Sequence, residues 1–227
     1  HAVFEQLVAA RCVGQPLAYL TGMREFWSLP LKLTRDTLVP RPETELLVQA
    51  ALTCVPADAA WRLADLGTGS GAIALALASE RLLCRVTATD ASTRALDVAR
   101  ENAARLGLGN VEFRRGDWYA ALPATRYHLI ASNPPYVRAA DPHLQQGDLR
   151  FEPWRALAGG ADGMQALRQI IAGAPAWLVA GGWLLLEHGF DQAEAVRELL
   201  AAQGFSEISS RQDLSGHVRV TLGQLSR

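Results

Sequence analysis

The sequence predicts an α/β fold in which a mostly parallel sheet of seven strands carries helices on both faces. From residue 61 onward, short apolar segments alternate regularly with segments of helical periodicity. Repeated strand–helix–strand units place their strands side by side in parallel. Apolar residues make up 49% of the 227 residues and charged residues 20%, which is enough material for one sizeable core.

Three elements are expected ahead of this alternation. Residues 1–11 have helical periodicity, and the pattern stops at Gly14. Residues 25–34 alternate apolar and polar side chains at a period of two from Phe26 onward, which is typical of a hairpin. Pro42 suits the first position of a helix that continues through Leu52.

The alternating region gives each strand and helix in turn. We expect strands over 62–66, 85–89, 111–114, 127–131, 183–187, 207–210 and 218–222. We expect helices over 72–80, 93–107, 164–179 and 192–203, and an irregular segment over 134–163. Ser92 is suited to cap the second of these helices and Gly107 to end it. Ligands of such sheets bind beyond the carboxyl ends of the strands.

The charge balance argues against a partner with a long phosphate backbone. Lys and Arg total 22 against 23 for Asp and Glu, a formal net charge of −1. Lys32 is the single lysine, and the arginines are scattered along the sequence. We attribute this preference for arginine to a GC-rich genome.

Cysteine usage and hydropathy favour a cytoplasmic protein. Cys12, Cys54 and Cys84 stand far apart, which argues against a disulfide framework and a zinc site, and we expect no metal. The longest apolar stretch, 176–186, is too short to cross a bilayer, and no secretion signal opens the chain. Because the first residue is His1, we expect the chain to be a fragment.

A glycine-rich loop follows the first strand of the alternating region. It reads Asp65-Leu-Gly-Thr-Gly-Ser-Gly71, and its glycines let the backbone turn sharply and approach a ligand closely. The spacing is that of neither a dinucleotide-binding loop nor a phosphate-binding P-loop. Plain turn chemistry is the alternative interpretation.

Two further strand ends carry residues suited to a nucleoside. Asp90 ends the second strand, where a carboxylate can accept the two ribose hydroxyls, and Trp118 follows the third, where an indole can pack on a base. Alone, Asp90 could be a helix cap and Trp118 a core residue. Together with the loop they predict a nucleoside site, and the missing pyrophosphate signature favours S-adenosylmethionine.

The fourth strand is followed by Asn133-Pro-Pro-Tyr136. The prolines stiffen the backbone, so the Asn133 side chain and the Pro134 carbonyl oxygen are held in fixed directions. Two such acceptors can grip the hydrogens of an NH2 group on a flat π system, and Tyr136 can stack on it. These two hydrogen bonds would hold the nitrogen, which is a poor nucleophile, against a methyl donor. They would also stabilise the positive charge that develops on the nitrogen. A merely rigid turn is the alternative.

At this point the sequence closely resembles the bacterial release-factor glutamine methyltransferases, the HemK/PrmC family. The matching segments cover nearly the whole chain from residue 17. They are 17–27, Val39-Pro-Arg-Pro-Glu-Thr-Glu45, 65–73, Gly116-Asp-Trp118, 132–136, Asp141-Pro-His-Leu144, Arg150-Phe-Glu-Pro153 and 181–189. The Asn-Pro-Pro-Tyr tetrapeptide is shared with adenine-N6 and guanine-N2 nucleic-acid methyltransferases. The segments around Arg41 and Arg150 are much more specific.

The resemblance implies a Rossmann-like class I methyltransferase domain that methylates N5 of the glutamine in the Gly-Gly-Gln tip of peptide chain release factors. S-adenosylmethionine would be the donor and S-adenosylhomocysteine the product. The implied cofactor residues are Gly67, Thr68, Gly69, Ser70, Gly71, Asp90, Trp118 and Asn133. The implied substrate residues are Asn133, Pro134, Pro135 and Tyr136, with Asn133, Pro134 and Tyr136 catalytic. A monomer with no nucleic acid or membrane partner is expected.

The same resemblance divides the chain into three parts. Residues 1–15 would end a helical N-terminal domain that helps to dock the release factor, 16–40 would be a hairpin linker, and 41–227 the catalytic domain. The chain departs from the family at His128, which replaces an acid in the fourth strand. A partly buried, neutral histidine is expected there.

Several other residues leave alternatives open. Asp141, His143, Arg150 and Glu152 crowd the segment after the motif, which either closes over a protein substrate or is a solvated loop. Glu187 and His188 end the fifth strand and either orient the site or provide ordinary strand-end polarity. Arg41 and Glu43 are candidates to line the site from the hairpin side, and Cys84 is expected in the core.

Three alternatives to the release-factor function are considered. A ribosomal-protein glutamine methyltransferase is the nearest. A nucleic-acid base methyltransferase shares the tetrapeptide, but the missing basic excess and target-recognition segment count against it. A non-catalytic scaffold should have lost Asn133 or the glycine loop, and both are intact.

Overall fold

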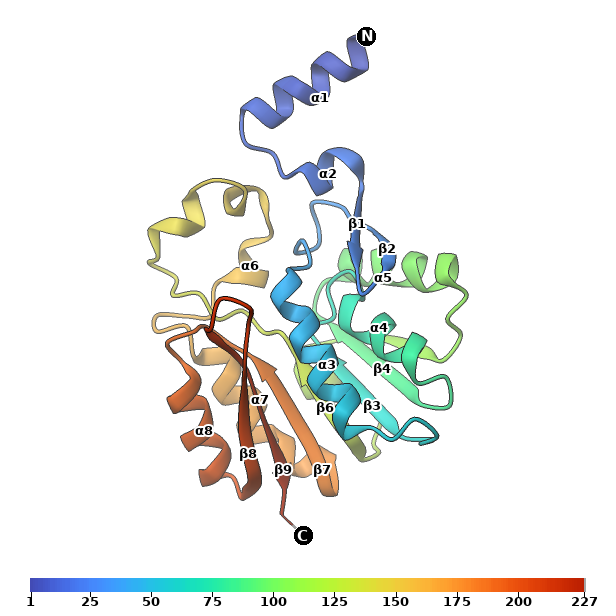
Figure 1. Ribbon diagram of the computed structural model, residues 1–227, viewed down its shortest axis with the longest axis vertical. Coiled ribbons are helices and arrows are strands. Elements are labelled where there is room, and N and C mark those ends of the chain that lie inside the picture. Colours follow the sequence, from blue (N-terminus) through green and yellow to red (C-terminus); the bar gives the residue numbers. More distant parts are fainter. Residues whose placement is uncertain (227) are drawn as a thin grey trace.

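The computed structural model describes residues 1–226, and its centre is one seven-stranded sheet. The strands are β3 (Arg62–Leu66), β4 (Arg85–Asp90), β5 (Val111–Arg115), β6 (Tyr127–Ser132), β7 (Leu178–Glu187), β8 (Phe205–Gln212) and β9 (Val218–Leu225). Their order across the sheet is β5-β4-β3-β6-β7-β9-β8, and Figure 1 labels all of these strands except β5. The strands from β5 to β7 are parallel, and β9 runs antiparallel to both of its neighbours. The predicted mostly parallel sheet is confirmed.

Helices cover both faces of this sheet. They are α3 (Glu45–Cys54), α4 (Ala72–Glu80), α5 (Thr93–Leu106), α7 (Gln165–Trp177) and α8 (Ala193–Ala202). Along each central strand, alternate residues enter two separate cores. Leu129 packs in the core that contains α3 and α4, whereas the next residue, Ile130, packs in the core that contains α7 and α8. The period of two along these strands therefore supplies both layers of the core.

Local signals account for the ends of α5. The Ser92 hydroxyl accepts a hydrogen bond from the backbone N–H of Ala95 at 3.2 Å. Gly107 ends the helix in the left-handed conformation, with φ of 69°. Both predictions are confirmed, and the cap places the first turn of α5 beside the carboxyl end of β4.

The predicted hairpin is present as β1 (Met23–Phe26) and β2 (Leu29–Lys32). Its two turn residues, Trp27 and Ser28, both have positive φ, which matches the twist of a two-residue hairpin. Asn102 of α5 holds the hairpin, because its side chain accepts from the Lys32 N–H at 2.7 Å and donates to the Lys32 carbonyl oxygen at 3.0 Å. The hairpin is thus fixed against the sheet's helical layer.

The structure corrects the sequence prediction in two places. The helix predicted over 164–179 ends at Trp177, because Leu178 already pairs with Tyr127 as the first residue of β7. This strand is longer than expected, and its irregular first half contains Gly181 at a φ of 75°. The segment predicted as irregular also contains short helices: η3 (Pro142–Gln145), η4 (Leu149–Phe151) and α6 (Trp154–Leu157).

The first helix lies apart from the sheet. α1 (Ala2–Cys12) contains no buried residue and projects from the rest of the molecule in Figure 1, and the short α2 (Leu17–Thr21) leads from it to the hairpin. Phe4 is 67% exposed. The domain boundaries at residues 15 and 40 stay a prediction.

Among residues 1–226, no helix combines the length and apolar character needed to span a membrane.

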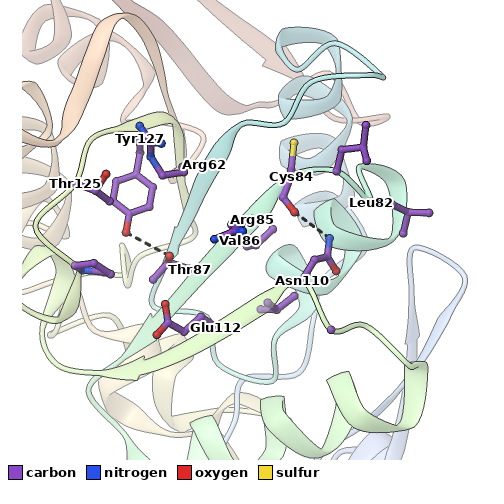
Figure 2. A pocket seen from close by; sticks show the side chains of 14 residues that line it. Arg62, Leu82, Cys84, Arg85, Val86, Thr87, Asn110, Glu112, Thr125 and Tyr127 are labelled. Carbon is purple, nitrogen blue, oxygen red and sulfur yellow. Dashed lines mark hydrogen bonds between the residues drawn. The ribbon is translucent and has the colours of Figure 1, made fainter.

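A hollow of about 660 Å³ lies at the amino ends of the strands, shown in Figure 2. Two of its lining side chains form hydrogen bonds to other residues of the hollow. The Tyr127 hydroxyl donates to the Thr87 hydroxyl at 3.3 Å, and the Asn110 side chain donates to the Cys84 carbonyl oxygen at 3.2 Å. The Cys84 side chain is buried, which confirms its predicted place in the core. Because ligands of parallel sheets bind at the opposite strand ends, the functional site is sought there.

Candidate active site

The glycine loop between β3 and α4 turns back on the end of β4. The N–H groups of Gly67 and Thr68 both donate to the Thr89 carbonyl oxygen at 2.9 Å. Gly67, Gly69 and Gly71 all have positive φ, at 77°, 56° and 90°. The sharp turn that the sequence predicted therefore favours glycine at all three positions.

The three glycines differ in what a side chain would meet. A Cβ at Gly71 would lie 2.9 Å from the Leu75 side chain, and one at Gly67 would lie 3.3 Å from the Trp118 ring. A Cβ at Gly69 would meet no described atom within 4 Å. Gly69 also lines the main cleft, so the space beside it belongs to whatever the cleft holds.

A buried carboxyl stands beneath this loop. Asp65 Oδ2 accepts from the Thr68 hydroxyl at 2.6 Å and from the Ala74 N–H at 3.1 Å, which holds the loop against the start of α4. Within residues 1–226, Asp65 Oδ1 has no hydrogen-bond partner. Burial raises the pKa of Asp65 to about 7 despite these two hydrogen bonds.

Asp90 connects the loop to the next helix. Its Oδ2 accepts from the Gly69 N–H at 2.9 Å, and its Oδ1 accepts from the Ser92 N–H at 2.8 Å. Burial raises the pKa of this carboxyl, and the two backbone hydrogen bonds oppose the rise. The carboxylate is fixed at the cleft wall, where it can still accept bonds from a ligand.

These elements enclose a cleft of about 790 Å³ at the carboxyl ends of the strands. Of the predicted site residues, the structure brings together on its wall Gly67, Gly69, Asp90, Trp118, Asn133 and Pro135. Thr68, Ser70 and Gly71 are buried behind the wall, and Pro134 and Tyr136 lie next to it without lining it. Its remaining wall comes from residues 35–38, 91–95, 115–117 and 153–156.

The mouth of the cleft is mixed in charge. Arginines that are scattered in the sequence meet there, from four separate segments: Arg35, Arg94, Arg115 and Arg155. Asp36, Asp90 and Asp117 lie among them, and Arg94 pairs with Asp36 at 3.4 Å. The acids offset most of the positive charge, so the cleft is not a basic channel.

Asn133 and Tyr136 are held by side chains from distant segments. Asn133 Nδ2 donates to the Thr44 hydroxyl at 3.1 Å, and the Tyr136 hydroxyl donates to Glu187 Oε1 at 3.1 Å. Burial and the neighbouring Glu187 raise the pKa of Tyr136 well above its usual value, so it remains a donor. Within residues 1–226, nothing donates to Asn133 Oδ1 or to the Pro134 carbonyl oxygen.

The polar pair at the end of β7 is fully buried. Burial raises the pKa of Glu187 to about 7, although the nearby Thr44 hydroxyl and the hydrogen bond from Tyr136 lower it. Burial lowers the pKa of His188, whose Nδ1 faces the Gly189 carbonyl oxygen at 2.9 Å. Its Nε2 therefore accepts from the Thr221 hydroxyl at 2.8 Å, as a neutral imidazole.

Arg41 and Glu43, the candidates to line the site from the hairpin side, do not line the cleft. Arg41 donates to Glu152, whose side chain is wholly buried and also accepts from the Val39 N–H at 3.0 Å. Glu43 is exposed, and neither it nor Arg41 lines the cleft. Glu152 therefore attaches the 137–163 segment to the hairpin side, which neither of the two interpretations of that segment included.

The other candidate residues of that segment, Asp141, His143 and Arg150, lie outside the core. His143 Nδ1 contacts Asp141 at 2.7 Å, and Arg150 donates to the Val13 carbonyl oxygen. Both His143 and Arg150 are exposed. Neither side chain reaches the cleft wall.

His128 behaves as expected of a neutral histidine. It is half-buried, stacks on Trp61 with ring centroids 5.1 Å apart, and accepts from the Arg62 N–H at 3.1 Å. Burial and the nearby Arg62 lower its pKa. It lies near the start of β6, far along the strand from Asn133.

Sequence reasoning assigned no role to two residues that support the site. Thr44 belongs to a matched segment, but no local pattern indicates that its hydroxyl contacts Asn133. Asn102 is wholly buried and donates to the Ser70 carbonyl oxygen at 2.9 Å, in addition to holding β2. A polar residue at a core position of a helix was the available signal for Asn102.

The fold and the cleft together define a class. A sheet of this strand order, with a glycine loop after its first central strand and a strand-end acid beside it, is the fold of class I methyltransferases. Residues 43–147 match the family model described as "Methyltransferase small domain".

Comparisons with known proteins narrow the class. The chain is 54% identical to the release factor glutamine methyltransferase of Xylella fastidiosa strain 9a5c, over 97% of this chain and 80% of that protein. It is equally similar, at 54% and the same coverage, to the release factor glutamine methyltransferase of Pseudomonas aeruginosa. The chain belongs to the release factor glutamine methyltransferase family.

A solved structure agrees with this. The release-factor-specific protein-(glutamine-N5) methyltransferase of Alicyclobacillus acidocaldarius is 29% identical, with a TM-score of 0.53. The match covers 87% of this chain and 100% of that one.

Proposed function

We propose that this chain transfers a methyl group from S-adenosylmethionine to N5 of the glutamine in the Gly-Gly-Gln tip of peptide chain release factors. The observation that carries the proposal is the pair of free acceptors, Asn133 Oδ1 and the Pro134 carbonyl oxygen, beside a nucleoside-sized cleft. Membership of the family, at 54% identity to two release factor glutamine methyltransferases, supports the choice of substrate.

The cleft residues fit S-adenosylmethionine. Open space beside Gly69 admits a ligand against the backbone, and the fixed Asp90 carboxylate offers acceptors for two ribose hydroxyls. The Trp118 indole lines the same cleft and can pack on the base.

S-adenosylmethionine supplies, when bound, a methyl group on a positively charged sulfur. The chain's own residues act on the other reactant. Asn133 Oδ1 and the Pro134 carbonyl oxygen accept the two hydrogens of a glutamine amide and fix its nitrogen in direction. The same acceptors stabilise positive charge as it develops on that nitrogen. No strong base is needed first, because the methylated cationic nitrogen loses its proton readily.

Two related functions use the same tetrapeptide. A ribosomal-protein glutamine methyltransferase would present the same amide in another protein. An adenine-N6 or guanine-N2 nucleic-acid methyltransferase would need a surface for phosphates, against which the net charge of −1 and the acids at the cleft mouth count. We further propose that the protein is a monomer, acts in the cytoplasm and binds no nucleic acid.

The test is transfer of labelled methyl from S-adenosylmethionine to a purified release factor. We expect labelling of the wild-type factor and none of a Gly-Gly-Gln→Gly-Gly-Ala factor, because the accepting amide is then missing. Ribosomal proteins, DNA and RNA serve as parallel substrates. Equal labelling of the Ala control, or label only in a parallel substrate, would overturn the proposal.

A further inference from the structure

Thr44 lies where η1 (Pro42–Thr44) meets α3, and its hydroxyl does not cap the helix. It ends η1, immediately precedes α3, and is 3% exposed. Its φ of −67° and ψ of −21° are helical, so its hydroxyl is not placed like that of an N-cap residue, whose backbone is extended. Its side chain makes no capping hydrogen bond, and the hydroxyl instead accepts from Asn133 Nδ2 at 3.1 Å. The hydroxyl is therefore used by the site rather than by the helix.

The other neighbour of Thr44 is a buried carboxyl. Glu187 is 1% exposed, and the Thr44 hydroxyl lies near enough to lower its pKa. The Tyr136 hydroxyl donates to Oε1 at 3.1 Å, while Oε2 has no geometrically good partner within residues 1–226. An ionised carboxylate only accepts hydrogen bonds. Above its pKa of about 7, where Glu187 is ionised, a hydroxyl that hydrogen-bonds to it must therefore be the donor, as the Tyr136 hydroxyl is.

This fixes the direction of the next hydrogen bond. A threonine hydroxyl has one hydrogen and two lone pairs. With its hydrogen directed to Glu187, Thr44 can only accept from its second neighbour. Asn133 must then present its NH2 group to Thr44, which leaves Oδ1 as the atom that faces the cleft.

We propose that Thr44, anchored by Glu187, is a positioning residue that selects the amide orientation in which Asn133 offers an acceptor to the substrate. The proposal rests on the proposed function, since it concerns an NH2 substrate. In the flipped orientation, the Asn133 NH2 group would face the NH2 group of the substrate. Neither group can accept from the other, so the hydrogen bond that holds the substrate nitrogen is lost.

The first test observes Asn133 directly and needs no substrate. The chain holds three asparagines, Asn102, Asn110 and Asn133, so selective 15N-asparagine labelling gives three side-chain NH2 pairs. Asn133→Asp identifies the pair of interest by its loss. At pH 8, we expect Thr44→Val to change the shifts and solvent exchange of the Asn133 pair, because one N–H loses its acceptor. Unchanged signals would overturn the proposal.

The second test uses turnover. Thr44→Val removes the hydroxyl at nearly constant volume, and we expect kcat to fall by roughly tenfold or more with S-adenosylmethionine affinity unchanged. Thr44→Ser restores the hydroxyl and should recover most of kcat. The matched control is Thr53→Val on α3, whose hydroxyl bonds only to the Ala50 carbonyl oxygen within the described chain, and which should retain wild-type turnover.

The outcomes separate this proposal from the proposed function. Wild-type enzyme that does not label a release factor refutes that substrate, whereas the NMR comparison still decides whether Thr44 orients Asn133. Wild-type labelling with full activity in Thr44→Val, or failure of Thr44→Ser to recover turnover, would refute the positioning role alone.

Discussion

Two buried carboxyls are the least ordinary residues of this chain. Asp65 and Glu187 lie at the carboxyl ends of β3 and β7, and burial raises the pKa of each to about 7. Each also keeps one oxygen without a good partner in the described chain. Such groups cost stability, and they persist where the surrounding structure uses them. Here Asp65 holds the glycine loop and Glu187 holds Tyr136 and Thr44.

The buried position of Glu187 predicts a specific pH dependence of stability. Its pKa rises from 4.5 to about 7 on folding, so between these values the folded state holds a proton that the unfolded state has lost. Stability therefore falls as pH rises through this window and stays reduced above it. Glu187→Gln removes the effect. Its free energy of unfolding relative to wild type should rise by roughly 2 kcal/mol from pH 5 to pH 8.

Urea denaturation of both proteins at the two pH values measures this difference. The comparison cancels every other group that titrates equally in both, Asp65 included. Glu198→Gln, an exposed substitution on α8, is the control and should follow wild type. A difference between Glu187→Gln and wild type that does not vary with pH would contradict the prediction.

At the scale of elements, the three glycines of the loop between β3 and α4 have different roles. Gly71 leaves room for the side chains of Leu75 in α4 and Ala99 in α5, and Gly67 lets Trp118 lie close to the backbone. Gly69 has only open cleft beside it. The first two positions concern packing, and the third concerns the ligand.

This difference predicts that Gly69→Ala separates folding from binding. The positive φ of 56° costs about 1 kcal/mol with a side chain, and no described atom lies within 4 Å of the new methyl group. The methyl group would occupy ligand space instead. We expect a folded protein whose affinity for S-adenosylmethionine, measured by calorimetry, falls at least tenfold.

Gly107→Ala is the matched control for that experiment. Gly107 has a φ of 69° and likewise meets nothing within 4 Å, but it ends α5 away from the cleft. It should lose a similar amount of stability and keep wild-type affinity. Equal affinities in the two variants would show that the space beside Gly69 is not used by the ligand.

The ion pair of the partly exposed Arg41 with the wholly buried Glu152 is the other feature at this scale. It connects the residue before η1 to the residue after η4, and the adjacent residues 153–156 form part of the cleft wall. Breaking a buried pair costs far more than breaking an exposed one. The pair therefore gives a long segment with little regular structure a fixed place at the site.

At the scale of the whole molecule, the chain is a packed sheet domain with one loosely attached helix. α1 buries no residue, and its main polar connection to the remainder is the exposed pair of Arg11 with Asp148 at 2.8 Å. Exposed ion pairs contribute at most about 1 kcal/mol. The sheet domain should therefore fold without it.

Deletion of residues 1–12 tests this. We expect a single cooperative unfolding transition with Tm within about 3 °C of wild type and unchanged binding of S-adenosylmethionine, because no core residue is removed. Leu47→Ala in α3, a core position with 0% exposure, is the contrast and should cost about 2–5 kcal/mol. Loss of the cooperative transition on deletion would show that α1 belongs to the folding unit.

Much of the fold follows from short-range signals. The bounds of β3 and α4 agree with the prediction, since the apolar period and the flanking glycines are local properties of the chain. The prediction failed around residue 178, where pairing of Leu178 with Tyr127 overrides a helical pattern that continues to Val179. Pairing with a strand 51 residues away leaves no mark in the local sequence.

The sequence by itself determined the element order, the glycine loop, the strand-end acid Asp90 and the stiff Asn133 motif, because each depends on residues that are near neighbours in the chain. Only the tertiary structure decided which side chains support them. Thr44 reaches Asn133 across 89 residues, and Arg41 reaches Glu152 across 111. These contacts depend on how the hairpin side and the sheet are brought together, and therefore the orientation of Asn133 became visible only in the folded molecule.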